Sequence, residues 1–260
     1  MIKKTINYCW FGKSELDEKS RLCIESWKKI MPDYEIKRWD ESNYDVNKNS
    51  FVKEAYENKK WAFVSDYARL DIIYNYGGIY LDTDVEVIKT FDDLLENDGF
   101  MGFEIGNYVA TGLGFGAVAG HPFLKENMDA YNNIKLYLPD GKLNDVVCPI
   151  ITTKLLQKYN LELNNKLQTI KGIKIYPTDY FCPMSFQTGE INITTNTHSI
   201  HRYNMSWISK EEQKFHGYYQ KLNKRFGKKI ANFIVDLISI PYRIKRRIQR
   251  IIRKAKNKYE

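Results

Sequence analysis

The sequence predicts an α/β domain with a largely parallel sheet, followed by a basic helical tail. Strand-like and helix-like segments alternate through the N-terminal part, one apolar run ends in two aspartates, and basic residues concentrate near the C-terminal end. The chain has 260 residues and a hydrophobic content of 43%, which is ample for the core of one large domain with an appendage. We expect the domain to cover residues 1–207 and the tail to cover residues 208–260.

The first elements follow from apolar patterns and from the residues that end them. Gly12 marks a turn after the first strand, and Pro32 stops the first helix because proline cannot continue one. Gly77 stands where the C-cap glycine of a helix is expected. In chain order, we predict a strand at 3–10, a helix at 16–30, a strand at 34–39 and helices at 52–58 and 61–76.

The rest of the domain is less regular. Shorter strands are predicted at 99–104, 112–119 and 173–176, with a helix at 122–131. Parallel sheets of α/β proteins bind ligands at the carboxyl ends of their strands. We therefore expect the ligand site at that edge, with the loops 106–116 and 181–190 facing a second substrate.

Two carboxylates lie two residues apart on an apolar run that follows the pair Gly77-Gly78. In a strand, side chains at even spacing share a face, so Tyr80, Asp82 and Asp84 would point the same way. Such a pair at the end of a buried strand suits a hard divalent cation that carries phosphate oxygens. The alternative is a pair of solvated carboxylates, since Asp-x-Asp alone is common.

Two further segments carry groups suited to a nucleotide sugar. Helical spacing places Asp66 and Arg69 on one face of a helix. A guanidinium beside a carboxylate can bind sugar hydroxyls and phosphate together. The alternative is an ordinary surface ion pair. Trp10 ends the first strand and would stack on a base, an interaction worth about 1–3 kcal/mol in nucleic-acid binding; the alternative is core packing.

A fourth segment lies near the end of the domain. A neutral imidazole at His201 would complete the shell of the cation, although a lone histidine is more often structural. Ser206 and the indole N–H of Trp207 would donate hydrogen bonds to phosphate.

Together these segments resemble glycosyltransferase family 32, the DXD-containing sugar transferases of capsular polysaccharide synthesis. Fungal initiating mannosyltransferases and the catalytic domains of clostridial glucosylating toxins are more distant relatives. The resemblance runs from about Ile6 to Trp207. It is strongest in Tyr8-Cys9-Trp10-Phe11-Gly12, in residues 23–29 and 32–36, in Phe63-Val64-Ser65-Asp66-Tyr67-Ala68-Arg69 and in Tyr76-Gly77-Gly78-Ile79-Tyr80-Leu81-Asp82-Thr83-Asp84.

The resemblance implies a GT-A type fold, a Mn²⁺ or Mg²⁺ ion, a nucleotide-sugar donor with UDP favoured, and retention of anomeric configuration. It assigns catalytic roles to Asp66, Arg69, Asp82 and Asp84, and metal binding to Asp82, Asp84 and His201. It assigns nucleotide-sugar binding to Trp10, Phe11, Ser65, Asp66, Arg69, Tyr80, Asp82, Ser206 and Trp207. No side chain is recognisable as a covalent nucleophile, so we expect the acceptor hydroxyl to attack from the leaving-group side.

The tail carries most of the net charge of +8. From Ile208 to Glu260 it holds 16 Lys or Arg against 4 Asp or Glu, while residues 1–207 hold 24 against 28. Isoleucines recur at helical spacing on both sides of Pro241, with arginines and lysines between them. This pattern predicts a basic amphipathic helix that is interrupted at Pro241 and binds the surface of an anionic membrane. The alternative is a helix packed on the domain. Nucleic-acid binding is disfavoured because aromatics are scarce in the Arg-rich part.

The composition indicates where in the cell the protein is expected. Its four cysteines show no Cys-x-x-Cys spacing, no apolar signal segment begins the chain, and no run of about 18 apolar residues occurs. We expect a cytoplasmic enzyme, peripheral on the inner face of the membrane, with a glycan or lipid-linked glycan acceptor.

Two other functions stay open. A phosphohydrolase of the haloacid-dehalogenase kind also places Asp-x-Asp after an apolar strand, although Glu86 stands where that class usually has Thr or Val. The other is a non-catalytic, membrane-associated binding protein.

Overall fold

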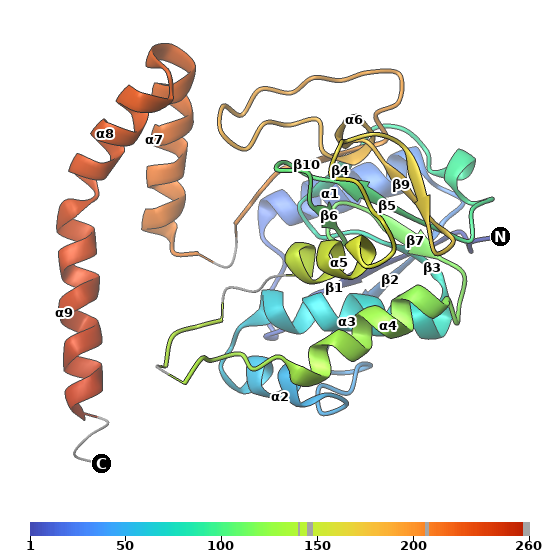
Figure 1. Ribbon diagram of the computed structural model, residues 1–260, viewed down its shortest axis with the longest axis horizontal. Helices are drawn as coiled ribbons and strands as arrows, with labels where there is room; N and C mark the ends of the chain where they lie inside the picture. Colours follow the sequence, from blue (N-terminus) through green and yellow to red (C-terminus); the bar gives the residue numbers. More distant parts are fainter. Residues whose placement is uncertain (140, 145–147, 206–207, 257–260) are drawn as a thin grey trace. The chain divides into compact units, whose positions relative to one another are not determined.

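The computed structural model describes residues 1–139, 141–144, 148–205 and 208–256, and the chain forms two compact units (Figure 1). Unit 1 comprises Met1–Met184 and Ile191–Asn204, and unit 2 comprises Ser185–Glu190 and Met205–Glu260. Unit 1 contains the sheets, and unit 2 contains the basic tail.

The main sheet of unit 1 has the strand order β2-β1-β3-β7-β5-β9-β8, with β6 paired to β5. Strands β2, β1, β3, β5 and β9 run in the same direction, whereas β7 lies antiparallel between β3 and β5, and β8 is antiparallel to β9. This confirms the α/β class and the mixed, largely parallel sheet. The strand bounds are β1 Thr5–Cys9, β2 Glu35–Trp39, β3 Gly78–Tyr80, β5 Gly99–Phe103, β6 Val109–Ala110, β7 Phe115–Ala117, β8 Gln168–Ile170 and β9 Ile173–Tyr176.

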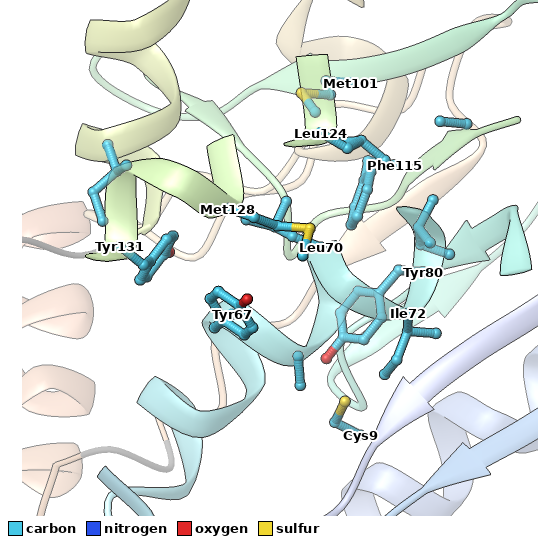
Figure 2. Close-up of a cluster of buried hydrophobic side chains, with 14 of the residues drawn as sticks. Cys9, Tyr67, Leu70, Ile72, Tyr80, Met101, Phe115, Leu124, Met128 and Tyr131 are labelled. Carbon is cyan, nitrogen blue, oxygen red and sulfur yellow. The ribbon is translucent and has the colours of Figure 1, made fainter. Parts of the chain in front are cut away.

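The helices of unit 1 cover both faces of this sheet. Met101 and Phe103 of β5 belong to a core with side chains from α2, α3, α4 and α5, part of which Figure 2 shows; Phe100 belongs to a second core with α1 and α6. Alternate residues of one strand therefore point into different cores. The helix bounds are α1 Glu18–Ile30, α2 Ser50–Glu57, α3 Trp61–Tyr76, α4 Pro122–Ala130, α5 Cys148–Gln157 and α6 Thr178–Phe181, with 3-10 turns at Asp92–Leu94 and Tyr131–Asn133.

Most predicted elements are present. The helix predicted at 61–76 is α3, and Gly77 ends it with a φ of 69°, a conformation that favours glycine. The helix predicted at 52–58 begins earlier, at Ser50, because the side chain of Asn49 accepts a hydrogen bond from the backbone N–H of Phe51 and caps it.

The continuous strand expected through both aspartates is wrong. Strand β3 ends at Tyr80, and the chain turns at the aspartates, where the N–H of Val85 donates to the carbonyl of Asp82 at 3.0 Å. The next strand, β4 (Val85–Val87), leaves the main sheet and pairs antiparallel with β10 (Ser199–His201). The two aspartates therefore lie in a turn between two sheets.

The described part of unit 2 consists largely of three helices: α7 (Lys210–Phe226), α8 (Lys228–Ile238) and α9 (Ile240–Lys256). The helical tail is thus confirmed, with its interruption at Ser239 and with Pro241 in the first turn of α9, where proline is tolerated. No helix in the described part of the chain is long and apolar enough to span a membrane.

Candidate active site

The acidic turn begins where β3 leaves the centre of the sheet. The N–H of Leu81 donates to the carbonyl of Asn7 on one side, and the N–H of Asp82 donates to the carbonyl of Gly112 on the other, each at 3.1 Å. The middle of β1 and the loop after β6 therefore fix the backbone that carries both aspartates.

Asp82 is bound by two side chains. Its Oδ1 accepts hydrogen bonds from Arg69 Nη2 at 3.0 Å and from the hydroxyl of Tyr80 at 3.1 Å. The same Nη2 lies 3.2 Å from Asp66 Oδ1, and Arg69 is only 4% exposed. One buried guanidinium thus neutralises charge on two carboxylates from different elements, so the structure joins Asp66, Arg69, Tyr80 and Asp82 as the sequence predicts.

Burial raises the pKa of Asp82 to about 6; the positive charge of Arg69 opposes this shift, and the negative charge of Asp84 adds to it. Asp82 is therefore a carboxylate that is costly to keep ionised in this structure. A cation beside it would relieve that cost.

Asp84 is held by the closing segment of unit 1. His201 Nε2 lies 3.3 Å from Asp84 Oδ1, the N–H of Asn204 donates to Oδ2 at 2.8 Å, and the N–H of Arg202 donates to the backbone carbonyl of Asp84 at 2.9 Å. Burial disfavours the charged form of Asp84, but His201 and the hydrogen bond from the N–H of Asn204 outweigh it, so the pKa is lowered. The pKa of His201 is raised, because Asp84 outweighs its burial.

The donor atoms here suit a divalent cation only in part. Among the described residues, no group of three or more His, Cys, Asp or Glu side chains is arranged to hold a metal ion. However, Asp84 and His201 are adjacent, Asp82 Oδ2 has no hydrogen bond within the described chain, and His201 Nδ1 and Asn204 Nδ2 are buried without a partner there. Carboxylate oxygens, and the imidazole nitrogen of His201 once it has lost its proton, fit Mn²⁺ or Mg²⁺ if a ligand supplies further oxygens.

Two residues of this site were missed by the sequence interpretation. Gly112 lies so close to Asp82 that a Cβ on it would be 2.1 Å from Asp82 Oδ2. Glu104 follows β5 on the face of Gly102, and its carboxyl is affected by the charges of His201 and Asp82. Glu104 ends a predicted strand, so the rule that ligands bind at carboxyl ends would have found it.

Burial raises the pKa of Glu104 to about 7, with His201 opposing the shift and Asp82 adding to it. No hydrogen bond or ion pair of its carboxyl group occurs within the described chain. A partly buried acid with a raised pKa, near two other titratable groups, is typical of a functional site.

The remaining predicted residues are more dispersed. Trp10 is partly buried at the end of β1, and its indole N–H donates to the carbonyl of Ser14 at 2.8 Å. Phe11 is buried in the core, with its ring 5.8 Å from that of Tyr44, so it is not placed to contact a ligand directly. The hydroxyl of Ser65 donates to the carbonyl of Trp61 inside α3. The predicted residues Ser206 and Trp207 lie outside the described residues.

Several solved structures are similar to part of this chain. PaToxG glycosyltransferase is 23% identical, covers 60% of this chain and 68% of its own, and has a TM-score of 0.46. A glycosyltransferase involved in the glycosylation of the major capsid of PBCV-1 is 12% identical; the match covers 81% of this chain and 98% of that protein, with a TM-score of 0.43. The galactosyltransferase LgtC is 13% identical; the match covers 82% of this chain and 95% of LgtC, also with a TM-score of 0.43.

Two curated relatives match shorter stretches. Human alpha-1,4-N-acetylglucosaminyltransferase is 38% identical over 74 residues, which is 28% of this chain and 20% of the relative. Inositol phosphoceramide mannosyltransferase 3 of Schizosaccharomyces pombe is 32% identical over 131 residues, or 47% of this chain and 35% of the relative. The matched stretches thus span between a fifth and about a third of these relatives.

One protein family matches part of the chain. Its description is "Glycosyltransferase sugar-binding region containing DXD motif", and the match covers residues 17–101. This range includes Asp66, Arg69, Asp82 and Asp84. In the structure Arg69 contacts both Asp66 and Asp82, and Asp84 lies in the same turn as Asp82. Residues 17–101 of this chain are therefore similar to a glycosyltransferase sugar-binding region with its DXD motif at Asp82-Thr83-Asp84.

Proposed function

We propose that this protein is a metal-dependent, retaining glycosyltransferase that moves a hexose from a nucleotide-sugar donor, preferably a UDP-sugar, to a glycan acceptor. One observation carries the proposal. The aspartates of the DXD turn contact Arg69 on one side and His201 on the other, inside a segment similar to glycosyltransferase sugar-binding regions.

Each charged residue of the site has a role in this reaction. Asp82, Asp84 and His201 would hold Mn²⁺ or Mg²⁺, which supplies positive charge to the diphosphate leaving group. Arg69 keeps Asp82 in place through its 3.0 Å contact, and Asp66 fixes the same guanidinium. The charged groups that bind and orient the donor are thus in position before the donor binds. Such preorganisation is the main source of catalysis by electrostatic stabilisation.

The acceptor side of the site is assigned to Glu104. Its carboxyl group has no partner within the described chain and would accept a hydrogen bond from a second hydroxyl of the acceptor, beside the attacking one. In the transfer, the bond between the anomeric carbon and the phosphate oxygen breaks, a bond to the acceptor oxygen forms on the same face, and the leaving phosphate oxygen takes the hydroxyl proton. Detection of a glycosyl-enzyme adduct by mass spectrometry would contradict this route.

The identities of donor and acceptor are part of the proposal. The curated relatives are named for N-acetylglucosaminyl and mannosyl transfer, so UDP-N-acetylglucosamine and GDP-mannose belong among the donors tested beside UDP-glucose and UDP-galactose. We assign the acceptor to lipid-linked glycans of capsular or cell-surface polysaccharide synthesis, reached from the cytoplasmic face of the membrane; the basic tail supports this.

Donor hydrolysis tests the proposal without knowledge of the acceptor. The purified protein is incubated with each of the four nucleotide sugars and Mn²⁺, with and without EDTA, and release of UDP or GDP is measured. We expect metal-dependent release from at least one donor, and a loss of at least about 100-fold in Asp84→Asn. Asp129→Asn, at an exposed position of α4, is the matched control.

The same preparation separates the other functions. Hydrolysis of p-nitrophenyl phosphate without turnover of any donor would indicate a phosphohydrolase that uses Asp82 as nucleophile. Absence of both activities, with no nucleotide binding, would favour a binding protein.

A further inference from the structure

Two helices of unit 2 carry an uncovered apolar surface, which we call the tail face. Its residues recur at helical spacing on α8 and α9, and their side chains are between 41% and 70% exposed. The tail face consists of Ile230, Phe233, Leu237, Ile238, Ile240, Ile244 and Ile248. Large apolar side chains that are exposed at helical spacing on consecutive helices are typical of an interaction site.

The packing of unit 2 on itself does not use the tail face. Helix α9 is attached to α7 through Tyr242, whose hydroxyl lies 2.8 Å from that of Ser209 and whose ring lies 5.6 Å from that of Phe215. Arg246 forms an ion pair with Glu212. At 100° per residue, Tyr242 and Arg246 lie on the opposite side of α9 from Ile240, Ile244 and Ile248.

Positive charge borders the apolar residues. Helix α9 contains eight Lys or Arg and no Asp or Glu. Lys245 follows Ile244 by one position and Arg247 follows it by three, which places one basic residue at each edge of the apolar stripe. Long basic side chains at the edges of such a stripe reach the headgroups of a lipid layer while their stems cover apolar surface.

This combination favours one partner. A second copy of the chain would bring two rows of basic residues together, and like charges in contact are unfavourable. Nucleic acid would attract the charges but leave the isoleucines without a partner. A bilayer of anionic phospholipid satisfies both, because its headgroups are negative and its acyl boundary is apolar.

We propose that the tail face binds the surface of an anionic phospholipid membrane, with the apolar residues of α8 and α9 below the headgroups and Lys245 and Arg247 among them. The helices lie in the interface and do not cross it, in agreement with the lack of any spanning helix in the described chain. The inference does not depend on the proposed sugar transfer, because it uses residues of unit 2 only.

Vesicle sedimentation of the full-length protein tests the proposal. The vesicles contain phosphatidylcholine alone or phosphatidylcholine with 30% phosphatidylglycerol, in 0.1 M and 0.5 M NaCl. We expect binding to the anionic vesicles, at least about tenfold weaker binding to the neutral ones, and weaker binding at high salt.

Two double variants separate the apolar and the charged contributions. Ile244→Gln with Ile248→Gln removes apolar area, and Lys245→Gln with Arg247→Gln removes two charges; each should weaken binding to anionic vesicles about tenfold or more. Leu22→Gln with Leu167→Gln alters exposed leucines outside unit 2, and Lys214→Gln with Lys221→Gln removes two exposed charges from α7. These controls should bind like the unmodified protein.

The inference would be overturned by equal binding to neutral and anionic vesicles or by unchanged binding in either test variant. A concentration-dependent dimer in ultracentrifugation that Ile244→Gln with Ile248→Gln abolishes would also overturn it. Equal affinity for a 20-nucleotide RNA, measured by fluorescence anisotropy, would also overturn it. Donor hydrolysis is measured in parallel. Its absence from every sample would reject the transfer reaction but leave the lipid result unaffected.

Discussion

Arg69 shows how single residues set the properties of the candidate site. It is buried, and its guanidinium contacts Asp66 and Asp82 while its Nε donates to the carbonyl of Ser65. A buried charge is tolerated only when it is paired and hydrogen-bonded. The position of Asp82 thus depends on neighbouring residues that need not touch a substrate. Substitutions of these neighbours should therefore change the activity of the site.

Gly112→Ala tests how closely Asp82 is confined. The new methyl group would lie 2.1 Å from Asp82 Oδ2 and 3.2 Å from Arg69 Nη1, so the carboxylate must move. We expect donor hydrolysis to fall about 10–100-fold, because misplacement of a site residue by about 1 Å has effects of this size. Gly217→Ala, in α7 with no atom within 4 Å of the added Cβ, should leave hydrolysis unchanged. Normal activity of Gly112→Ala would show that Asp82 is not closely confined.

Glu104→Gln has opposite expected effects on stability and activity. The pKa of Glu104 is raised to about 7, so its contribution to stability is fully present below about pH 4.5 and is lost as the pH rises through 7. Glutamine stays neutral, and the variant should therefore be about 1–3 kcal/mol more stable than the wild type at pH 8 and equal to it at about pH 4. Urea unfolding at both pH values measures this.

The same variant should transfer or hydrolyse donor at least about tenfold more slowly at pH 8, since it cannot act as a charged acceptor of a hydrogen bond. Higher stability with lower activity is typical of a functional residue. If Glu104→Gln instead destabilises the protein at pH 8 and leaves turnover unchanged, Glu104 has a structural role only.

At the scale of elements, α1 supports the acidic turn. The indole N–H of Trp27 donates to the carbonyl of Val85 at 2.7 Å, and the hydroxyl of Ser26 accepts from the N–H of Val87 at 2.9 Å. Strand β4 therefore takes hydrogen bonds from α1 on one side and from β10 on the other. These contacts explain why the chain leaves the main sheet after Tyr80.

Trp27→Phe tests this support. It removes the donor to Val85 and leaves a buried carbonyl unsatisfied, in addition to a loss of packing volume, so we expect a destabilisation of about 1–3 kcal/mol. Trp61→Phe is the matched control, because the indole N–H of Trp61 has no hydrogen-bond partner within the described chain and its side chain is only partly buried. Equal unfolding free energies of the two variants would show that the hydrogen bond to β4 is unimportant.

The elements also show what the sequence could and could not predict. Helix α3 and its end at Gly77 followed from periodicity and a glycine, which are local signals. The turn at Asp82 did not, because Tyr80 to Val87 has a regular strand pattern and only the distant partners Trp27 and His201 decide that it bends. Likewise, the burial of Phe11 beside Tyr44 depends on a contact between residues far apart in sequence.

At the scale of the whole molecule, two units with different surfaces are joined in one chain. Residues 1–207 hold more acidic than basic residues, while the tail carries the excess of Lys and Arg. The aspartates, Arg69 and His201 belong to unit 1, and the tail face belongs to unit 2. Chemistry at the DXD turn and attachment to a lipid surface are thus proposed for separate parts of the protein, and each is tested by its own substitutions.

The central claim is that the turn at Asp82 and Asp84, with His201, holds a divalent ion together with the diphosphate of a nucleotide. Binding of Mn²⁺ by electron paramagnetic resonance, with UDP or GDP present, tests it most directly, because the readout does not require turnover. We predict that the wild type and Asp129→Asn bind Mn²⁺ with one of the two nucleotides, and that Asp84→Asn binds at least about tenfold more weakly. Equal Mn²⁺ affinity in Asp84→Asn, or no bound Mn²⁺ in the wild type with either nucleotide, would contradict the claim.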